Sequence, residues 1–358
     1  MFNIFTKFLV LMSILGVVIF PTEVIATGTE AVELAFYRVI PSLFTFFVLQ
    51  SLVVSMGISD VLSDTFGVIF KKIFRVSDSS PYILGIIGGY PMGFKSVMEL
   101  YGNKKISKDE AERMVGFCNN AGPAFIIGFV GVFLFSNKNI GYVLLLGHIL
   151  ASVVVGMIFS VKNEETRVFR IKKVSEKPFY ENFISAVNGG FSSVLMVCGY
   201  VIFFSIFAQI LTQFNVFSTI ATIFSPILNQ IGINNEQFTA ILIGMIEMTS
   251  GINYLQGIDA SIVLKIIIAS FLLAFSGASI HFQTLSFNKG LNLRKYYITK
   301  LIQSILAPIF SVIAYKIIYS KAKTVFLAGN YSDFRHCSFN DIAIITLFLL
   351  ILLKKSRK

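Results

Sequence analysis

Long apolar stretches run through most of this chain of 358 residues and restrict the folds open to it. The hydrocarbon core of a bilayer is ~30 Å thick, so a helix needs about 20 largely apolar residues to cross it. Charged residues make up only 14% of the sequence, far fewer than in soluble domains. We therefore predict a membrane-spanning helix in each of the stretches Ile4–Phe20, Val39–Met56, Met114–Phe135, Gly141–Val161, Val194–Gln213, Ile262–Phe287 and Tyr296–Tyr319.

Each end of the chain allows a second interpretation. The run Ile342–Leu353 is short for a span and becomes an eighth crossing only if Phe339 and Asn340 are included. Near the N-terminus, Lys7, the apolar run after it and the small-residue end Val24-Ile25-Ala26 also fit a cleavable signal peptide. We expect this first segment to be retained as a helix.

Two further apolar stretches are interrupted at their middle. Tyr82–Leu100 is broken by Gly88-Gly89-Tyr90-Pro91-Met92-Gly93, and Phe238–Leu255 by Glu247-Met248-Thr249-Ser250-Gly251. Each half is too short to cross, and a broken helix leaves unpaired backbone groups that only protein or a water-filled cavity can satisfy at membrane depth. Both stretches are therefore predicted to be re-entrant hairpins.

Basic residues test this topology because they gather in cytoplasmic loops. If both hairpins return to the side they enter, one face receives the basic segments 71–75, 104–113 and 162–177, the loop with Lys289, Arg294, Lys295 and Lys300, and the basic C-terminus. That face and both termini are therefore expected in the cytoplasm. Topology accounts for the net charge of +11, so no nucleic-acid partner is expected.

The cysteines and histidines are too few and too scattered for a metal site or a disulfide framework. They are Cys118, Cys198 and Cys337 with His148, His281 and His336, and their spacing does not suit metal ligands. No cofactor is expected. The crossings lack His-Glu-x-x-His, Gly-x-Ser-x-Gly and a pair of catalytic Asp residues, so we do not expect an enzyme.

The order of predicted elements recurs along the chain. From Val39 it reads crossing, amphipathic stretch (Val61–Phe74), hairpin, crossing, crossing, and the same order returns later with Phe217–Ile231 as the amphipathic stretch. An odd number of crossings per unit inverts the second copy, as in secondary transporters. The predicted fold is an all-α polytopic membrane protein with about eight transmembrane helices and two re-entrant hairpins in two inverted repeats.

This pattern divides the chain into five parts. We expect an N-terminal helix and outer loop at 1–38, a first repeat at 39–161, a charged cytoplasmic linker at 162–189, a second, inverted repeat at 190–320, and a loop with the short last run at 321–358.

In the first repeat, candidate substrate contacts lie at the hairpin break and in the next crossing. Lys95 is left at membrane depth. Either it contacts an anion, or it pairs with Glu99 or snorkels toward the membrane surface. Asn119 and Asn120 are either polar substrate ligands or interhelical hydrogen-bond partners, and Pro123 frees a carbonyl one turn back. The predicted binding residues of this repeat are Tyr90, Gly93, Lys95, Asn119, Asn120, Gly122 and Pro123.

In the second repeat, Glu247 is the leading candidate, because an intramembrane carboxylate is costly and by default functional. It either carries a coupling proton or cation, or serves as a structural acceptor for His281. The remaining predicted binding residues are Thr249, Gly251, Ser279, His281 and Gln283. His148 is expected to be an interhelical hydrogen-bond donor.

Several short motifs add a resemblance to a known family. They are Ile19-Phe20-Pro21, Ile40-Pro41-Ser42-Leu43-Phe44, Gly89-Tyr90-Pro91-Met92-Gly93-Phe94-Lys95, Lys108-Asp109-Glu110-Ala111-Glu112-Arg113 and Phe117-Cys118-Asn119-Asn120-Ala121-Gly122-Pro123, with the segments around Glu247 and His281. From the first crossing to Tyr319 the chain resembles the sporulation integral membrane proteins of the nucleoside-recognition (gate) domain superfamily.

The resemblance implies a substrate as well as a fold. Members of the family are associated with moving dipicolinate into the developing forespore, which implies a secondary transporter for a small organic anion in a membrane around the forespore. Lys95, Asn119, Asn120, Ser279 and His281 would suit its carboxylates, and Glu247 would carry coupling. The alternatives are a nucleoside or other small-metabolite carrier and a sporulation scaffold that does not transport. Besides the substrate and the lipid bilayer, a second copy of the chain is left open as a partner.

Overall fold

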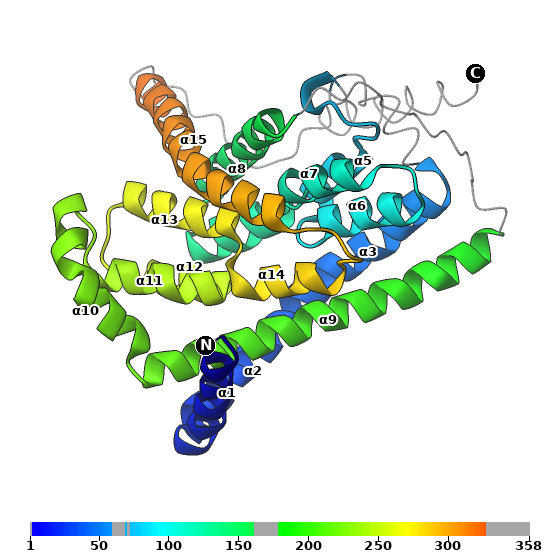
Figure 1. Ribbon diagram of the computed structural model, residues 1–358. Coiled ribbons are helices and arrows are strands. Elements are labelled where there is room, and N and C mark those ends of the chain that lie inside the picture. Colours follow the sequence, from blue (N-terminus) through cyan, green and yellow to red (C-terminus); the bar gives the residue numbers. More distant parts are fainter. Residues whose placement is uncertain (1, 59–68, 70–71, 161–177, 327–358) are drawn as a thin grey trace.

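The regular elements that the structure describes are all helices. A computed structural model describes residues 2–58, 69, 72–160 and 178–326 (Figure 1). The first half contains α1 (Phe2–Ile19), α2 (Pro21–Leu34), η1 (Ala35–Val39), α3 (Ile40–Ser55), α5 (Ser80–Gly88), α6 (Met92–Gly102), α7 (Lys108–Cys118), η2 (Ala124–Leu134) and α8 (Lys138–Ile158). The second half contains α9 (Phe179–Gln213), α10 (Val216–Leu228), η3 (Asn229–Ile231), α11 (Asn235–Ile246), α12 (Met248–Gly257), α13 (Ile262–Phe275), α14 (Gly277–Ser286) and α15 (Arg294–Phe326).

Helices long and apolar enough to cross a membrane confirm the predicted polytopic membrane protein. Within the described residues there are four: Lys138–Ile158, Phe179–Gln213, Ile262–Ser286 and Arg294–Tyr319. A bent pair, Lys7–Ile19 with Pro21–Tyr37, brings the number to five if it counts as one span. The short run Ile342–Leu353, predicted as an eighth crossing, lies outside the described residues.

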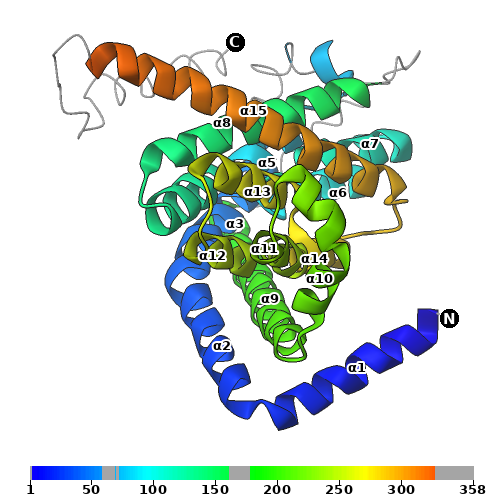
Figure 2. The same cartoon turned by 90° about the vertical axis from the view of Figure 1, so that its left-hand side faces the viewer.

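Two segments differ from the sequence prediction. The expected outer loop before residue 38 is helical, because Pro21 opens α2 at a position where its missing N–H costs nothing. A bend of 101° separates α1 from α2, and the two form an arm at the side of the other helices (Figure 2). The predicted crossing Met114–Phe135 is split into α7 and η2 by residues 119–123.

Both predicted hairpins are broken helices, and glycines bring their arms into contact. α5 and α6 meet at the break around Gly89, and α11 and α12 meet at Glu247. A methyl group on Gly85 would overlap Cα of Gly93 in the other arm, and one on Gly251 would overlap the backbone of Gly244. A methyl group on Gly93 would also overlap the carbonyl oxygen of Cys118 at the end of α7. Backbone therefore packs directly on backbone beside each break, which any side chain would prevent.

The described helices follow a similar order in the two halves of the chain. A long helix, a broken hairpin, a second broken segment and a final helix occur as α3, α5–α6, α7–η2 and α8, and again as α9, α11–α12, α13–α14 and α15. Corresponding helices pack in pairs, α3 on α9 and α8 on α15. α10 takes the position predicted for the second amphipathic stretch, whereas most of Val61–Phe74 lies outside the described residues. The repeat itself and the inverted orientation of its second copy stay predictions.

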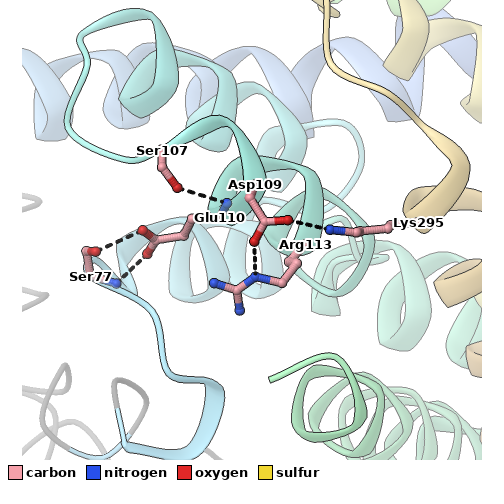
Figure 3. Close-up of polar contacts among 6 residues, drawn as sticks. All are labelled: Ser77, Ser107, Asp109, Glu110, Arg113 and Lys295. Atoms are coloured by element: carbon pink, nitrogen blue, oxygen red, sulfur yellow. Dashed lines mark hydrogen bonds and ion pairs between the residues drawn. The ribbon is translucent and has the colours of Figure 1, made fainter. Parts of the chain in front are cut away.

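A cluster of polar contacts fixes the N-terminal end of α7 (Figure 3). The Ser107 hydroxyl caps the helix by accepting from the Glu110 amide at 3.2 Å, and the Glu110 carboxylate accepts from the Ser77 hydroxyl at 2.8 Å. Asp109 accepts from Arg113 Nε at 3.2 Å and from Lys295 Nζ at 2.6 Å. These contacts join the segment before α5, the start of α7 and the start of α15.

We expect Gly93→Ala to destabilise the protein, because the added methyl overlaps a backbone carbonyl that cannot move aside. Overpacking of this kind costs about 1–3 kcal/mol, which should appear as a lower thermal unfolding midpoint of the purified protein in detergent. Gly102→Ala in the same helix is the matched control, since nothing lies within 4 Å of the added atom. Equal midpoints for the two variants would contradict the backbone contact.

Asp109 should give stability a dependence on acidic pH. It lies before the predicted crossing, and hydrogen bonding by Lys295 holds its pKa below the ordinary value of 3.8. A lowered folded-state pKa stabilises the fold fully above 3.8, and that contribution is lost as pH falls through the lowered pKa. Asp109→Asn should therefore cost a small, constant amount, below about 1 kcal/mol for an exposed pair, between neutral and mildly acidic pH. Unfolding measured over a pH series should show the two proteins converging in stronger acid; a gap that widens there would contradict this assignment.

Candidate functional site

A cavity of about 290 Å³ lies where helix breaks from both halves of the chain meet. Its walls include Gly88–Tyr90 from the first hairpin, Ala121 and Gly122 from the α7–η2 break, and Glu247–Thr249 from the second hairpin. Residues of η2 and of α3, α9 and α14 complete the lining, among them Leu43, Phe46, Phe125, Phe129, Val197, Val201, Ile280 and Gln283. The structure thus brings both hairpin breaks to one cavity.

Glu247 is the charged residue of the cavity wall. It ends α11 and caps α12, and only 2% of its surface is exposed. Its carboxylate accepts from the Thr249 amide at 3.2 Å, from the Ser250 amide at 2.7 Å and from the Ser250 hydroxyl at 2.9 Å. These bonds and the N-terminal end of the half-helix favour a negative charge here. The sequence left open that Glu247 is a structural acceptor for His281. No hydrogen bond between the two side chains is found among the described residues.

The rest of the cavity wall is largely apolar and rich in aromatic rings. Phe125 and Phe129 stack with their ring centroids 5.2 Å apart. Thr249 and Gln283 provide polar groups, and the Gln283 amide donates to the Ser279 hydroxyl at 3.3 Å. Such a wall suits a small flat ligand with a few polar substituents.

Tyr90 connects the cavity to a buried amine. Tyr90 lines the cavity, and its hydroxyl donates to the Leu273 carbonyl at 3.0 Å and accepts from Lys300 Nζ at 3.3 Å. Lys300 also donates to Gln303 Oε1 at 3.0 Å and to the Asn119 carbonyl. With 1% of its surface exposed, Lys300 is a core residue.

This position corrects the prediction that Lys300 belongs to a basic cytoplasmic loop. α15 begins at Arg294 and continues without a break past Lys300, so the helix turns this side chain inward while Lys295 stays at the surface. A signal for Lys300 was available, because it lies inside the predicted span Tyr296–Tyr319, where a charge is by default functional. Because Lys300 follows Arg294 and Lys295 closely in the sequence, it was instead grouped with these loop residues.

Asn119 and Asn120 support the α7–η2 break and do not line the cavity. The Asn119 amide donates to Thr284 Oγ1 at 3.1 Å, and Asn120 Oδ1 accepts from Gln303 Nε2 at 2.9 Å. Both partners lie on second-half helices, α14 and α15. Of the two roles left open by the sequence, the structure favours interhelical hydrogen bonding.

His148 satisfies a backbone group of the same break. Its Nε2 accepts from the Ala121 amide at 3.1 Å, so this nitrogen is an acceptor and not the predicted donor. Pro123 precedes the first residue of η2, and Gly122 fits against the backbone of Gly89. The break is therefore held open by a side chain from α8 and by a close contact with the first hairpin.

Lys95 lies away from the cavity wall. Its amine donates to the Ser193 hydroxyl at 3.2 Å and lies 5.3 Å and 5.8 Å from the ring centroids of Phe47 and Phe287. A close ion pair with Glu99 is not among its described contacts. The amine is thus held by α9 and two aromatic rings.

The other predicted binding residues have supporting positions. Gly93 and Gly251 form the backbone contacts of the hairpins, and Ser279 is buried behind Gln283. His281 Nδ1 forms a hydrogen bond with the Tyr296 hydroxyl at 2.9 Å. Of the predicted set, the cavity is lined by Tyr90, Gly122, Glu247, Thr249 and Gln283.

Comparison with known proteins adds one relative. The sporulation integral membrane protein YlbJ of Bacillus subtilis (strain 168) is 29% identical over 323 residues, which cover 82% of this chain and 79% of that protein. No family model and no solved structure matches the chain. The similarity confirms the predicted resemblance to a sporulation integral membrane protein, while the gate domain stays a prediction.

Proposed function

From this similarity and the cavity, we propose that the chain is a secondary transporter for a small organic anion, with dipicolinate during endospore formation as its substrate. It would act in a membrane that surrounds the forespore. The single observation that carries the proposal is the cavity itself, because its walls are helix breaks from both halves of the chain. Broken helices that meet between repeats are typical of secondary transporters.

The size and shape of the cavity fit a small aromatic substrate. Its volume of about 290 Å³ is near the lower end of the ~300–1,000 Å³ typical of small-molecule pockets. Dipicolinate is a planar ring with two carboxylates, so Tyr90, Phe125 and Phe129 can contact its faces. Thr249 and Gln283 offer donors for a carboxylate oxygen.

Glu247 limits how such an anion can bind. A carboxylate in the wall repels a dianion unless it is protonated or accompanied by a cation. This requirement supports a coupling role, in which Glu247 takes up a proton or cation together with the substrate.

The same carboxylate favours a second candidate, a nucleoside carrier. A nucleoside is neutral, its base can lie against the aromatic wall, and its hydroxyls can donate to Glu247. A scaffold without transport is the third alternative, and transport measurements distinguish all three.

The proposal is tested by uptake into proteoliposomes that contain the purified chain. Labelled dipicolinate should accumulate faster than in protein-free liposomes, and unlabelled dipicolinate should compete better than uridine. Uptake of uridine without dipicolinate would favour the nucleoside carrier. Absence of uptake for both, from a folded and correctly inserted protein, would favour the scaffold.

We expect Glu247→Gln to abolish coupling while binding persists, because glutamine keeps the shape of the side chain but cannot exchange a proton. Dipicolinate should still bind, and its uptake should no longer respond to an imposed pH gradient. Glu236→Gln is the matched control, since Glu236 lies at the exposed start of the same hairpin. A full gradient response in Glu247→Gln would exclude the coupling role.

Lys95→Met should leave the affinity for dipicolinate within about twofold, because the amine contacts Ser193 and does not line the cavity. Equilibrium binding to the purified variant measures this directly. A loss of affinity of about tenfold, equivalent to ~1.4 kcal/mol, would support the sequence-based prediction that Lys95 contacts the substrate.

A further inference from the structure

Lys300 is a buried amine whose described partners are neutral. It donates to the Asn119 carbonyl, the Tyr90 hydroxyl and Gln303 Oε1, and no ion pair of Lys300 with a carboxylate occurs within the described residues. Burying a charge is costly unless it is paired. Apolar residues of similar size would fill this position at lower cost, so the charge itself calls for a function.

The amine lies directly behind one wall of the cavity. Its nitrogen is 5.0 Å from the centroid of the Tyr90 ring, and Tyr90 lines the cavity. Little water separates the two, because Tyr90 is 8% and Lys300 1% exposed. An electrostatic interaction across this wall is therefore screened far less than one at the protein surface.

Other basic groups do not offer the same effect. Lys95 is bonded to Ser193 and does not line the cavity. His148 accepts a hydrogen bond from the Ala121 amide through Nε2. Glu247, the charged residue that does line the cavity, has the opposite sign. An anion in the cavity would thus meet Glu247 in the wall, and Lys300 is the amine in contact with the wall residue Tyr90.

We propose that Lys300 determines the preference of the cavity for an anionic over a neutral ligand, acting through the Tyr90 wall without touching the ligand. This inference rests on the proposed transport of an organic anion and names the residue that selects for its charge. Tyr90 separates the amine from the ligand and, through its hydroxyl, fixes the amine in position.

The test compares two ligands of nearly the same shape. Dipicolinate and its neutral analogue pyridine-2,6-dicarboxamide are titrated into the purified full chain in detergent, and the ratio of their dissociation constants is the readout. Lys300→Gln keeps hydrogen-bonding capacity and removes the charge. It should weaken dipicolinate binding about tenfold or more and leave dicarboxamide binding within about twofold.

Two further variants separate charge from structural support. Gln303→Glu puts a carboxylate beside the Lys300 amine, which Gln303 already contacts at 3.0 Å, and should shift the ratio in the same direction with Lys300 still present. Lys316→Gln, on the exposed side of α15, is the control for removing a charge from the same helix.

The outcomes distinguish this inference from the proposed function. If Lys300→Gln and Gln303→Glu weaken both ligands equally, Lys300 has only a structural role. If Lys300→Gln does not fold, an unchanged ratio in Gln303→Glu alone overturns the inference. A wild-type chain that binds neither ligand contradicts the proposed function, and the inference with it.

Discussion

Backbone groups freed where helices break must find partners inside the protein, and most of the site follows from this requirement. At the α7–η2 break the partners are His148, which accepts from the Ala121 amide, and Lys300, which donates to the Asn119 carbonyl. At the second hairpin the Glu247 carboxylate accepts from the amides of Thr249 and Ser250. Side chains that satisfy the breaks therefore also bring charge to the cavity, because the breaks form its walls.

The two charges have different relations to the cavity. Glu247 belongs to the wall itself and is held by neighbours in its own hairpin. Lys300 comes from α15 and reaches across to the first half of the chain, where Tyr90 and Asn119 accept from it. Removal of the two side chains would therefore affect the cavity differently. Loss of Glu247 changes contacts within one hairpin, whereas loss of Lys300 weakens the contact between the two halves of the chain.

The sequence predicted the helix breaks better than the side-chain directions. Glycine, proline and a lone intramembrane carboxylate are strong local signals, so both hairpins and the position of Glu247 in a break were predicted. Whether a side chain points into a cavity depends on the rotation of its helix and on what packs against it, and a single sequence does not contain that information. Lys95 was therefore assigned to the substrate, and Lys300 was grouped with Arg294 and Lys295, although one turn of helix separates an exposed from a buried position.

The glycine contacts beside the breaks also restrict how the molecule can move. Where Gly251 meets Gly244, and where Gly85 meets Gly93, there is no side chain between the backbones that could change rotamer and let them separate gradually. Each hairpin must then travel as a rigid unit, with its two arms together. Any rearrangement that exposes the cavity to one side of the membrane or the other has its hinges outside the hairpins, in the connections that lead into α5 and α11.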